Sequence, residues 1–142
     1  MSALAPTRWR RQVDRHLEPG EVVLHVGHGI EPPWWSGFLR LGSLLWRHYL
    51  LVATDRRLLL VEQRVRGGEK RCTALAWTEI ARAELGRGLL ARPLRLEAPA
   101  RGLRHRILVP RLSPLAGNLA AVEGVVATWA AQHAAPPRAA AL

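Results

Sequence analysis

Few residues in this sequence have both the type and the spacing that chemistry requires. His25 and His28 lie three positions apart in a stretch typical of a β-strand, so their side chains point to opposite faces and make a poor metal-binding pair. Cys72 follows Lys70 and Arg71, whose positive charges favour a thiolate, but neither a base nor a second cysteine accompanies it. We therefore expect a plain thiol and no metal site.

The acidic residues do not indicate catalysis either. Aspartate occurs only at Asp14 and Asp55, and the sequence has no evident paired carboxylates or Ser/His/Asp arrangement. The "GRG" at 86–88 is too short for a phosphate-binding fingerprint. The "TDRR" at 54–57 predicts a hairpin turn rather than a ligand site, because an aspartate carboxylate there accepts a local backbone N–H. We therefore expect a protein that is not an enzyme and that uses no cofactor.

Composition sets the class of partner and the compartment. The chain has 142 residues, which fits a single domain, and a formal net charge of +10. A strongly basic domain suits an anionic partner, namely a membrane, a nucleic acid or an acidic protein, although arginines can also simply solvate a surface. Because the single cysteine cannot form an internal disulfide and residues 1–15 do not resemble a signal peptide, we expect a cytoplasmic protein.

Hydrophobic periodicity predicts a mainly β protein with a helix at each end. Residues 7–17 form an amphipathic helix with Trp9, Val13 and Leu17 on its apolar face and Gln12 on the opposite side. The strand-like segments that follow at short spacing, typical of a sandwich or barrel, are 21–30, 48–54, 57–64, 72–77, 79–85, 93–98 and 104–109. The last element is an amphipathic helix over 113–135.

Two local expectations follow from these patterns. In the first strand, alternation places Val22, Leu24, Val26 and Ile30 on one face. In the last helix, Gly124 lowers stability by about 1 kcal/mol relative to alanine. This helix should therefore need packing against the sheet.

Four stretches of the chain carry a family resemblance. They are "LEPGEVVL" at 17–24, "LLVATDRRLLLVEQ" at 50–63, "ALAWTEIARAEL" at 74–85 and the final helix. The "PGE" turn into the first strand, the T-D-x-R-L hairpin and the later E-I strand resemble those of bacterial pleckstrin-homology-like (PH-like) domains. The resemblance implies a PH-like seven-stranded barrel or sandwich capped by a C-terminal α-helix, and a binding or membrane-adaptor module without catalytic residues.

This comparison divides the chain into three parts. Residues 1–16 are a basic, helical N-terminal segment, and residues 17–135 are the PH-like domain. Residues 136–142 are a disordered tail. Residues 31–47, with the run "WWSGFLRLGSLLWR", form an insertion that is long and apolar for a simple hairpin connection.

On a helical wheel the insertion is amphipathic. Its apolar face and flanks supply the predicted membrane or partner contacts, Trp34, Trp35, Phe38, Leu41, Leu45 and Trp46, with Leu39 and Leu44 beside them. Ser36, Arg40, Ser43 and Arg47 lie opposite. Such a helix suits the plane of a membrane interface, where tryptophan is favoured. It would not span the bilayer, because Arg40 would lie well inside the hydrocarbon.

Other structures explain the same pattern. The helix can pack on its own domain or on a second subunit, and an irregular loop can use its tryptophans to cap an open barrel end. Exposed, this many apolar side chains would promote aggregation, so something should cover them.

A basic stretch lies near the end of the strand series. Between 87 and 111 the one acidic residue is Glu97, and the predicted anion contacts are Arg87, Arg92, Arg95, Arg101, Arg104 and Arg106, with Arg111 at the end of the stretch. In this fold they come from neighbouring strands and loops and can meet phosphates. Alternatively, Arg95, Arg104 and Arg106 simply point outward from their strands.

We therefore predict a non-enzymatic PH-like module that attaches peripherally to the inner face of an anionic membrane. An apolar wedge and a basic patch together provide the two signals that stable attachment requires. The alternative is a protein-interaction or homo-oligomerisation module that buries the same tryptophan-rich surface in a partner. Nucleic-acid binding ranks third, because the sequence has no recognised nucleic-acid motif and its tryptophans do not lie among the arginines.

Overall fold

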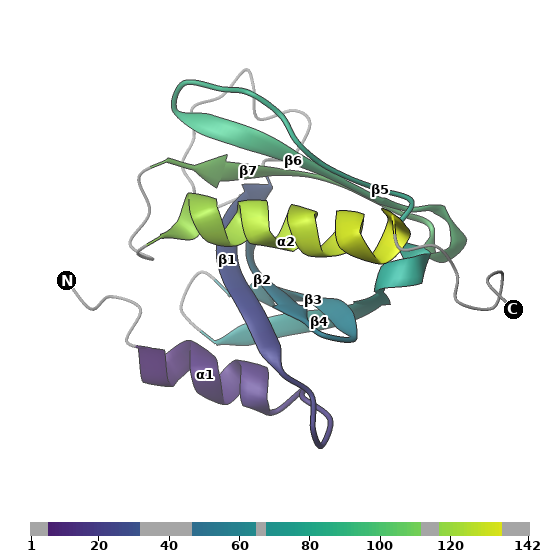
Figure 1. The fold of residues 1–142 in the computed structure, drawn as a ribbon. Coiled ribbons are helices and arrows are strands. Elements are labelled where there is room, and N and C mark those ends of the chain that lie inside the picture. The colour runs from purple at the N-terminus through teal and green to yellow at the C-terminus, as the bar shows by residue number, and fades with distance from the viewer. Residues whose placement is uncertain (1–5, 32–46, 65–67, 112–116, 135–142) are drawn as a thin grey trace, which may run out of the picture.

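The computed structural model describes residues 6–31, 47–64, 68–111 and 117–134, and Figure 1 shows the fold. Two α-helices flank a set of seven strands. The elements are α1 (Pro6–Asp14), β1 (Val23–Glu31), β2 (Arg47–Thr54), β3 (Arg57–Gln63), β4 (Glu69–Ala76), β5 (Arg82–Leu85), β6 (Ala91–Ala98), β7 (Leu103–Pro110) and α2 (Asn118–Ala134). Short 3₁₀ helices lie at Trp77–Glu79 and Pro99–Arg101. The predicted fold class is confirmed.

The seven strands form one antiparallel sheet in the order β4-β3-β2-β1-β7-β6-β5. β1 pairs with β2 over most of its length, but it pairs with β7 only where Ile30 faces Leu108. The sheet therefore consists of two halves that are joined at one point, β1–β4 and β5–β7. β4 and β5 remain as edges, so the sheet is not closed.

Both halves of the sheet share one hydrophobic core with α2. Leu51 and Leu58 from the first half and Leu94 and Ile107 from the second are fully buried, and they pack in the same cluster as Val122 of α2. Figure 1 shows α2 lying across the strands, so that it covers this face of the sheet. The packing that α2 needs is therefore supplied by the sheet, as expected from its sequence.

A second, smaller core lies on the other face of β2 and β3. Val13 of α1 is 1% exposed and packs with Leu50, Val52, Leu59 and Val61. This contact explains why β2 and β3 are buried on both faces, a pattern that a strand covered on one face does not show. In Figure 1, α1 lies on the side of the sheet away from α2.

Three expectations from the sequence are wrong in detail. Gln12 is only 8% exposed rather than on the outer side of α1. The residues expected in one strand from 79 to 85 are divided between the end of a 3₁₀ helix and β5. A bulge between Val23 and His25 shifts the register of β1, so Val23 packs with Val26. Val22 and Leu24, expected on the Val26 face, remain 55% and 46% exposed.

Glycines in β1 allow the two sheet halves and α2 to meet. A Cβ atom on Gly27 would lie 2.6 Å from Cγ2 of Val122, and one on Gly29 would lie 2.2 Å from Cγ2 of Ile107. Both distances are far below van der Waals contact, so a side chain at either position would displace its neighbour.

None of the helices in the described part of the chain has the length and apolarity needed to cross a bilayer.

Candidate functional site

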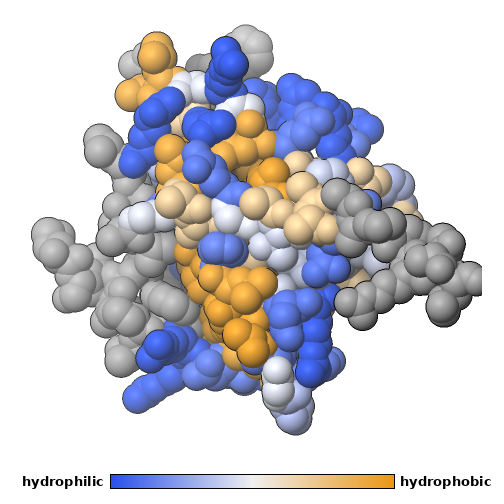
Figure 2. Space-filling model, in the orientation of Figure 1, coloured by the Kyte–Doolittle hydropathy of each residue, from blue (hydrophilic) through white to orange (hydrophobic). Residues whose placement is uncertain are grey.

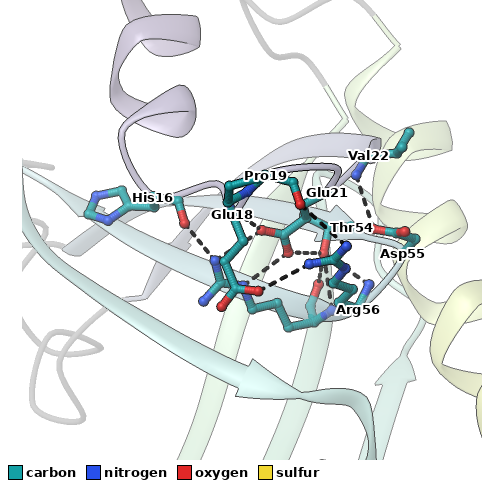
Figure 3. A network of polar contacts seen from close by, with 9 residues as sticks. His16, Glu18, Pro19, Glu21, Val22, Thr54, Asp55 and Arg56 are labelled. Atoms are coloured by element: carbon teal, nitrogen blue, oxygen red, sulfur yellow. Dashed lines mark hydrogen bonds and ion pairs between the residues drawn. The ribbon is translucent and has the colours of Figure 1, made fainter.

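The motif residues at the start of β1 form a polar network with the β2–β3 hairpin (Figure 3). The Glu21 side chain is fully buried. Its carboxylate accepts hydrogen bonds from Arg57 Nε and Nη2, each at 3.0 Å, and from Thr54 Oγ1 at 2.7 Å. Asp55 Oδ1 accepts the backbone N–H of Val22 at 3.0 Å. The network fastens the hairpin to β1, which confirms that "TDRR" is a structural turn.

The first arginine of the motif, Arg56, has a different environment from Arg57. Arg56 Nη1 donates to Glu18 Oε2 at 3.1 Å, and both side chains of this pair are about half exposed. Arg57, in addition to its bonds with Glu21, donates from Nη2 to the backbone carbonyl of His16, just after α1. Arg57 therefore connects the N-terminal segment, the start of β1 and the hairpin.

Glu21 makes the stability of the fold depend on pH. Its hydrogen bonds with Arg57, and then with Thr54, lower the carboxyl pKa from 4.5 to about 2. A lowered folded-state pKa contributes stability that is complete above pH 4.5 and is lost as pH falls toward 2. The loss amounts to about 3 kcal/mol for this group.

We expect the free energy of urea unfolding to fall between pH 5 and pH 2.5 more steeply in the wild type than in Glu21→Gln. The variant has lower stability at pH 7, but it lacks the carboxyl group that takes up the proton. Other carboxylates titrate in both proteins, so the difference between the two curves isolates Glu21. Parallel curves would show that Glu21 has an ordinary pKa.

The surface best suited to binding lies at the connection between β5 and β6. Leu89 and Leu90 at its tip are 91% and 86% exposed, the highest values among the exposed large hydrophobic residues. Arg87, Arg92 and Arg111 surround an open hollow beside them, together with Gly88 and Leu89. We call these residues, Arg87 to Leu90 with Arg92 and Arg111, the β5–β6 tip.

Two of the three arginines hold the β5–β6 tip in shape. Arg111 donates from Nε and Nη2 to the carbonyl oxygen of Gly88, at 3.1 and 2.9 Å, and Arg92 Nε donates to that of Gly86 at 2.8 Å. A Cβ atom on Gly88 would lie 1.8 Å from the carbonyl oxygen of Ala91, so the turn requires glycine. The tip is thus a built loop with its leucines directed away from the core.

The charge of the β5–β6 tip is positive. Arg92 pairs with Glu123 of α2 at 3.0 Å, and no described residue forms an ion pair with Arg87 or Arg111. Figure 2 shows a small hydrophobic patch at the upper left, where this connection turns in Figure 1, with hydrophilic surface beside it. The tip therefore combines a protruding apolar dipeptide with cationic neighbours.

The structure separates the six arginines that were predicted as anion contacts. Arg87 and Arg92 lie together at the β5–β6 tip. Arg95 and Arg106 face each other across β6 and β7 and are exposed, while Arg104 lies near Glu97 at 3.7 Å. Arg101 pairs with Glu79 at 3.1 Å, beyond the opposite end of β6. Their contact with an anion stays a prediction.

The predicted apolar contacts cannot be placed in the same way. Trp34, Trp35, Phe38, Leu41, Leu45 and Trp46 all lie outside the described residues. The described structure gives the two ends of their segment, Glu31 and Arg47, which are paired in the ladder of β1 and β2. Their role in binding therefore remains a prediction.

The histidines of β1 and the cysteine of β4 lie in different environments. His25 and His28 lie on opposite faces of β1, as expected: His25 lies under α2, whereas His28 stacks on His48. Burial and the nearby His48 lower the His28 pKa to about 4, so the ring is neutral at pH 7. Burial raises the pKa of the Cys72 thiol, which is the opposite of the activation that Lys70 and Arg71 would favour.

The sequence analysis did not single out Leu89 and Leu90, whose side chains the structure leaves exposed. Their signal is two adjacent leucines in a glycine- and arginine-rich loop, "GRGLLAR", outside any strand periodicity. Two apolar residues at a loop tip have no core to join, and this is the feature that could have identified them.

Comparison with known proteins agrees with this fold. A family model described as "Bacterial PH domain" matches residues 17–107, more than half of the chain. Among solved structures, the hSac2 domain from human phosphoinositide phosphatase Sac2 aligns over 94% of this chain and 86% of its own, with 13% identity and a TM-score of 0.59. No curated protein sequence matches.

The chain therefore belongs to the bacterial PH domain family. At 13% identity, the likeness to the human domain shows the shared fold alone. The "PGE" and "TDRR" motifs lie just before β1 and in the β2–β3 hairpin, where their side chains join the two elements.

Proposed function

We propose that this protein is a non-enzymatic binding module that attaches peripherally to an anionic membrane through the β5–β6 tip. The observation that carries the proposal is the pairing of Leu89 and Leu90, 91% and 86% exposed, with the arginines that frame them. An inserted apolar side chain and a basic neighbour act on the two regions of a bilayer surface, its acyl boundary and its phosphates.

The magnitudes are sufficient for reversible attachment. Full burial of a leucine side chain contributes about 1.5–3 kcal/mol, and each arginine near an anionic leaflet about 1 kcal/mol. Arg87, Arg92 and Arg111 are partly offset by Glu123, which leaves a net positive charge beside the leucines. Neither contribution alone gives firm binding, so the module should require both contacts.

The tryptophan-rich segment 32–46 supplies a further contact in this proposal. Its predicted apolar face would insert beside the lipid headgroups, where tryptophan is favoured. The human domain of the same fold comes from a phosphoinositide phosphatase, a name that refers to anionic lipids. The preference for a lipid surface over a protein partner rests on the arginines beside the exposed leucines of this chain.

The experiment is co-sedimentation of the full chain with vesicles of phosphatidylcholine alone and with vesicles containing phosphatidylglycerol. We expect the wild type to bind the anionic vesicles and Leu89→Ser/Leu90→Ser to bind them at least tenfold more weakly, since about 1.4 kcal/mol corresponds to tenfold. Arg87→Gln should weaken binding to anionic vesicles and leave any binding to neutral ones unchanged.

The matched control is Val22→Ser/Leu24→Ser, which removes two other exposed apolar side chains from the beginning of β1. We expect it to bind like the wild type. Trp34→Ser/Trp35→Ser/Phe38→Ser tests the tryptophan segment in the same assay. If the wild type stays in solution with both kinds of vesicle and sizing shows a dimer or larger, the membrane proposal is wrong and a protein interface is favoured.

A further inference from the structure

Three side chains that can bind a metal ion meet between the end of α1 and β4. His16 Nε2, Glu69 Oε1 and Cys72 Sγ all lie within 4.8 Å of one another. His16 comes from the turn after α1, whereas Glu69 and Cys72 lie on one strand and are separated from His16 by more than 50 residues. The fold therefore assembles a donor set that no local spacing in the sequence reveals.

The three donors match the preferences of one ion. Zinc binds imidazole nitrogen, thiolate sulfur and carboxylate oxygen, with metal–ligand lengths near 2.0–2.3 Å, so its ligand atoms lie about 3.3–3.7 Å apart. His16 Nε2 and Glu69 Oε1 now lie 2.5 Å apart in a hydrogen bond, with side chains 27% and 14% exposed. Side-chain movements of about 1 Å would open this pair around an ion.

One buried polar atom of α1 has no hydrogen-bond partner among the described residues. Gln12 lies one helical turn before His16, and its side-chain oxygen Oε1 is buried without a hydrogen-bond partner among the described residues. Gln12 belongs to α1, and His16 lies in the turn that follows the last residue of this helix, Asp14. A buried acceptor without a donor is costly, so an ion, or a water bound to an ion, would provide what Gln12 lacks.

The local charges permit a divalent cation. Arg57 is one nearby positive group, since it donates to the backbone oxygen of His16 and influences Cys72, and Lys70 and Arg71 lie between the two β4 ligands in the sequence. The charge of Arg57 is already matched by the buried carboxylate of Glu21. Cys72 releases its thiol proton to solvent on binding, and a zinc ion with the Glu69 carboxylate and the Cys72 thiolate is then neutral overall.

We propose that His16, Glu69 and Cys72 bind Zn²⁺, and that the ion fastens the N-terminal helix to β4. The consequence concerns the outer face of the sheet, where α1 covers Leu50, Val52, Leu59 and Val61. The bound metal links the turn after α1 to β4, two segments that are far apart in the sequence. Binding therefore stabilises the state in which α1 covers this face.

The test uses the full chain, stripped of metal with a chelator, kept reduced, and titrated with ZnCl₂ in a calorimeter. We expect the wild type to bind one Zn²⁺ per chain. The dissociation constant should be at least tenfold higher in Cys72→Ser and in His16→Gln. Titration with Co²⁺ gives a second readout: the wild type should show a thiolate-to-cobalt absorption band, and Cys72→Ser should not.

The control is His133→Gln, which removes a histidine on α2 away from α1 and should leave zinc affinity unchanged. Zinc should also raise the unfolding temperature of the wild type and of this control, but not of Cys72→Ser. If His16→Gln does not fold, Cys72→Ser decides. Failure of the wild type to bind Zn²⁺, or wild-type affinity in folded Cys72→Ser, overturns the proposal.

Discussion

Replacing Arg57 with methionine lowers the free energy of unfolding by about 3–5 kcal/mol, the cost of leaving a buried carboxylate without its cation. The carboxylate is that of Glu21, which is fully buried and accepts two hydrogen bonds from the guanidinium group. The substitution also removes the donor to the His16 carbonyl, so α1 loses a contact with the hairpin. Urea unfolding at pH 7, followed by circular dichroism, measures the effect.

The neighbouring residue is the matched control. Arg56→Met removes the same charge one position earlier, but its partner Glu18 is 58% exposed and the pair itself is solvated. Exposed ion pairs contribute about 0–1 kcal/mol, so this variant should unfold close to the wild type. Similar losses in the two variants would show that Glu21 is not the buried centre of the network.

A double variant separates the interaction from general damage. In Glu21→Gln/Arg57→Met the buried charge is gone, and the glutamine oxygen can still accept from Thr54 Oγ1, 2.7 Å from the glutamate carboxylate. We expect the double variant to lose less stability than the two single variants together, with a coupling of about 1–3 kcal/mol. An additive result would contradict a direct Glu21–Arg57 interaction.

The fold could be predicted because its signals are local. Each strand has its own run of β-branched or leucine residues and its own turn, and the "PGE" and "TDRR" motifs are turn chemistry that acts within a few residues. The two ends of the network are nevertheless more than 30 residues apart, so the partner of Glu21 could not be read from spacing. Propensity and pattern thus identify the elements and the family, and leave the contacts between them undetermined.

The residues that sequence reasoning placed wrongly all depend on those long-range contacts. Gln12 is buried because α1 lies on β2 and β3, which nothing in an 11-residue helix pattern specifies. Val22 and Leu24 leave the expected face because one extra residue enters β1 at the bulge. Such a bulge reverses the alternation on one side of it, so a period of two cannot reveal it.

The exposure of the candidate site also depends on contacts that the sequence pattern does not specify. The leucines of the β5–β6 tip could be seen in the sequence as a dipeptide, but their exposure depends on how Arg92 and Arg111 hold the loop. These two arginines were interpreted as phosphate contacts, and the structure gives each of them backbone carbonyl partners as well. Their charge is therefore held in a fixed position, and in the proposed attachment this would favour a defined orientation of the domain on the bilayer.

Replacing Gly124 with alanine is expected to destabilise the protein by about 2 kcal/mol, although alanine is the better helix former. Propensity alone predicts a gain of about 1 kcal/mol at this position in α2. A Cβ atom there would lie 2.4 Å from Cε1 of His25 and 2.6 Å from both ring nitrogens. The histidine ring sits directly beneath the helix, so the alanine methyl group would force α2 away from β1 or the ring out of its position.

The sign of the change separates the two explanations, and thermal or urea unfolding measures it. Ala127→Gly, at an exposed position one turn away, calibrates propensity in the same helix and should cost about 1 kcal/mol. In His25→Ala, which removes the ring, Gly124→Ala should become neutral or stabilising, because the methyl group then has space. A stabilised Gly124→Ala protein with His25 intact would mean that the helix does not lie this close to β1. His25 and Gly124 thus form one packing contact, in which the histidine ring occupies the space that a side chain at position 124 would need.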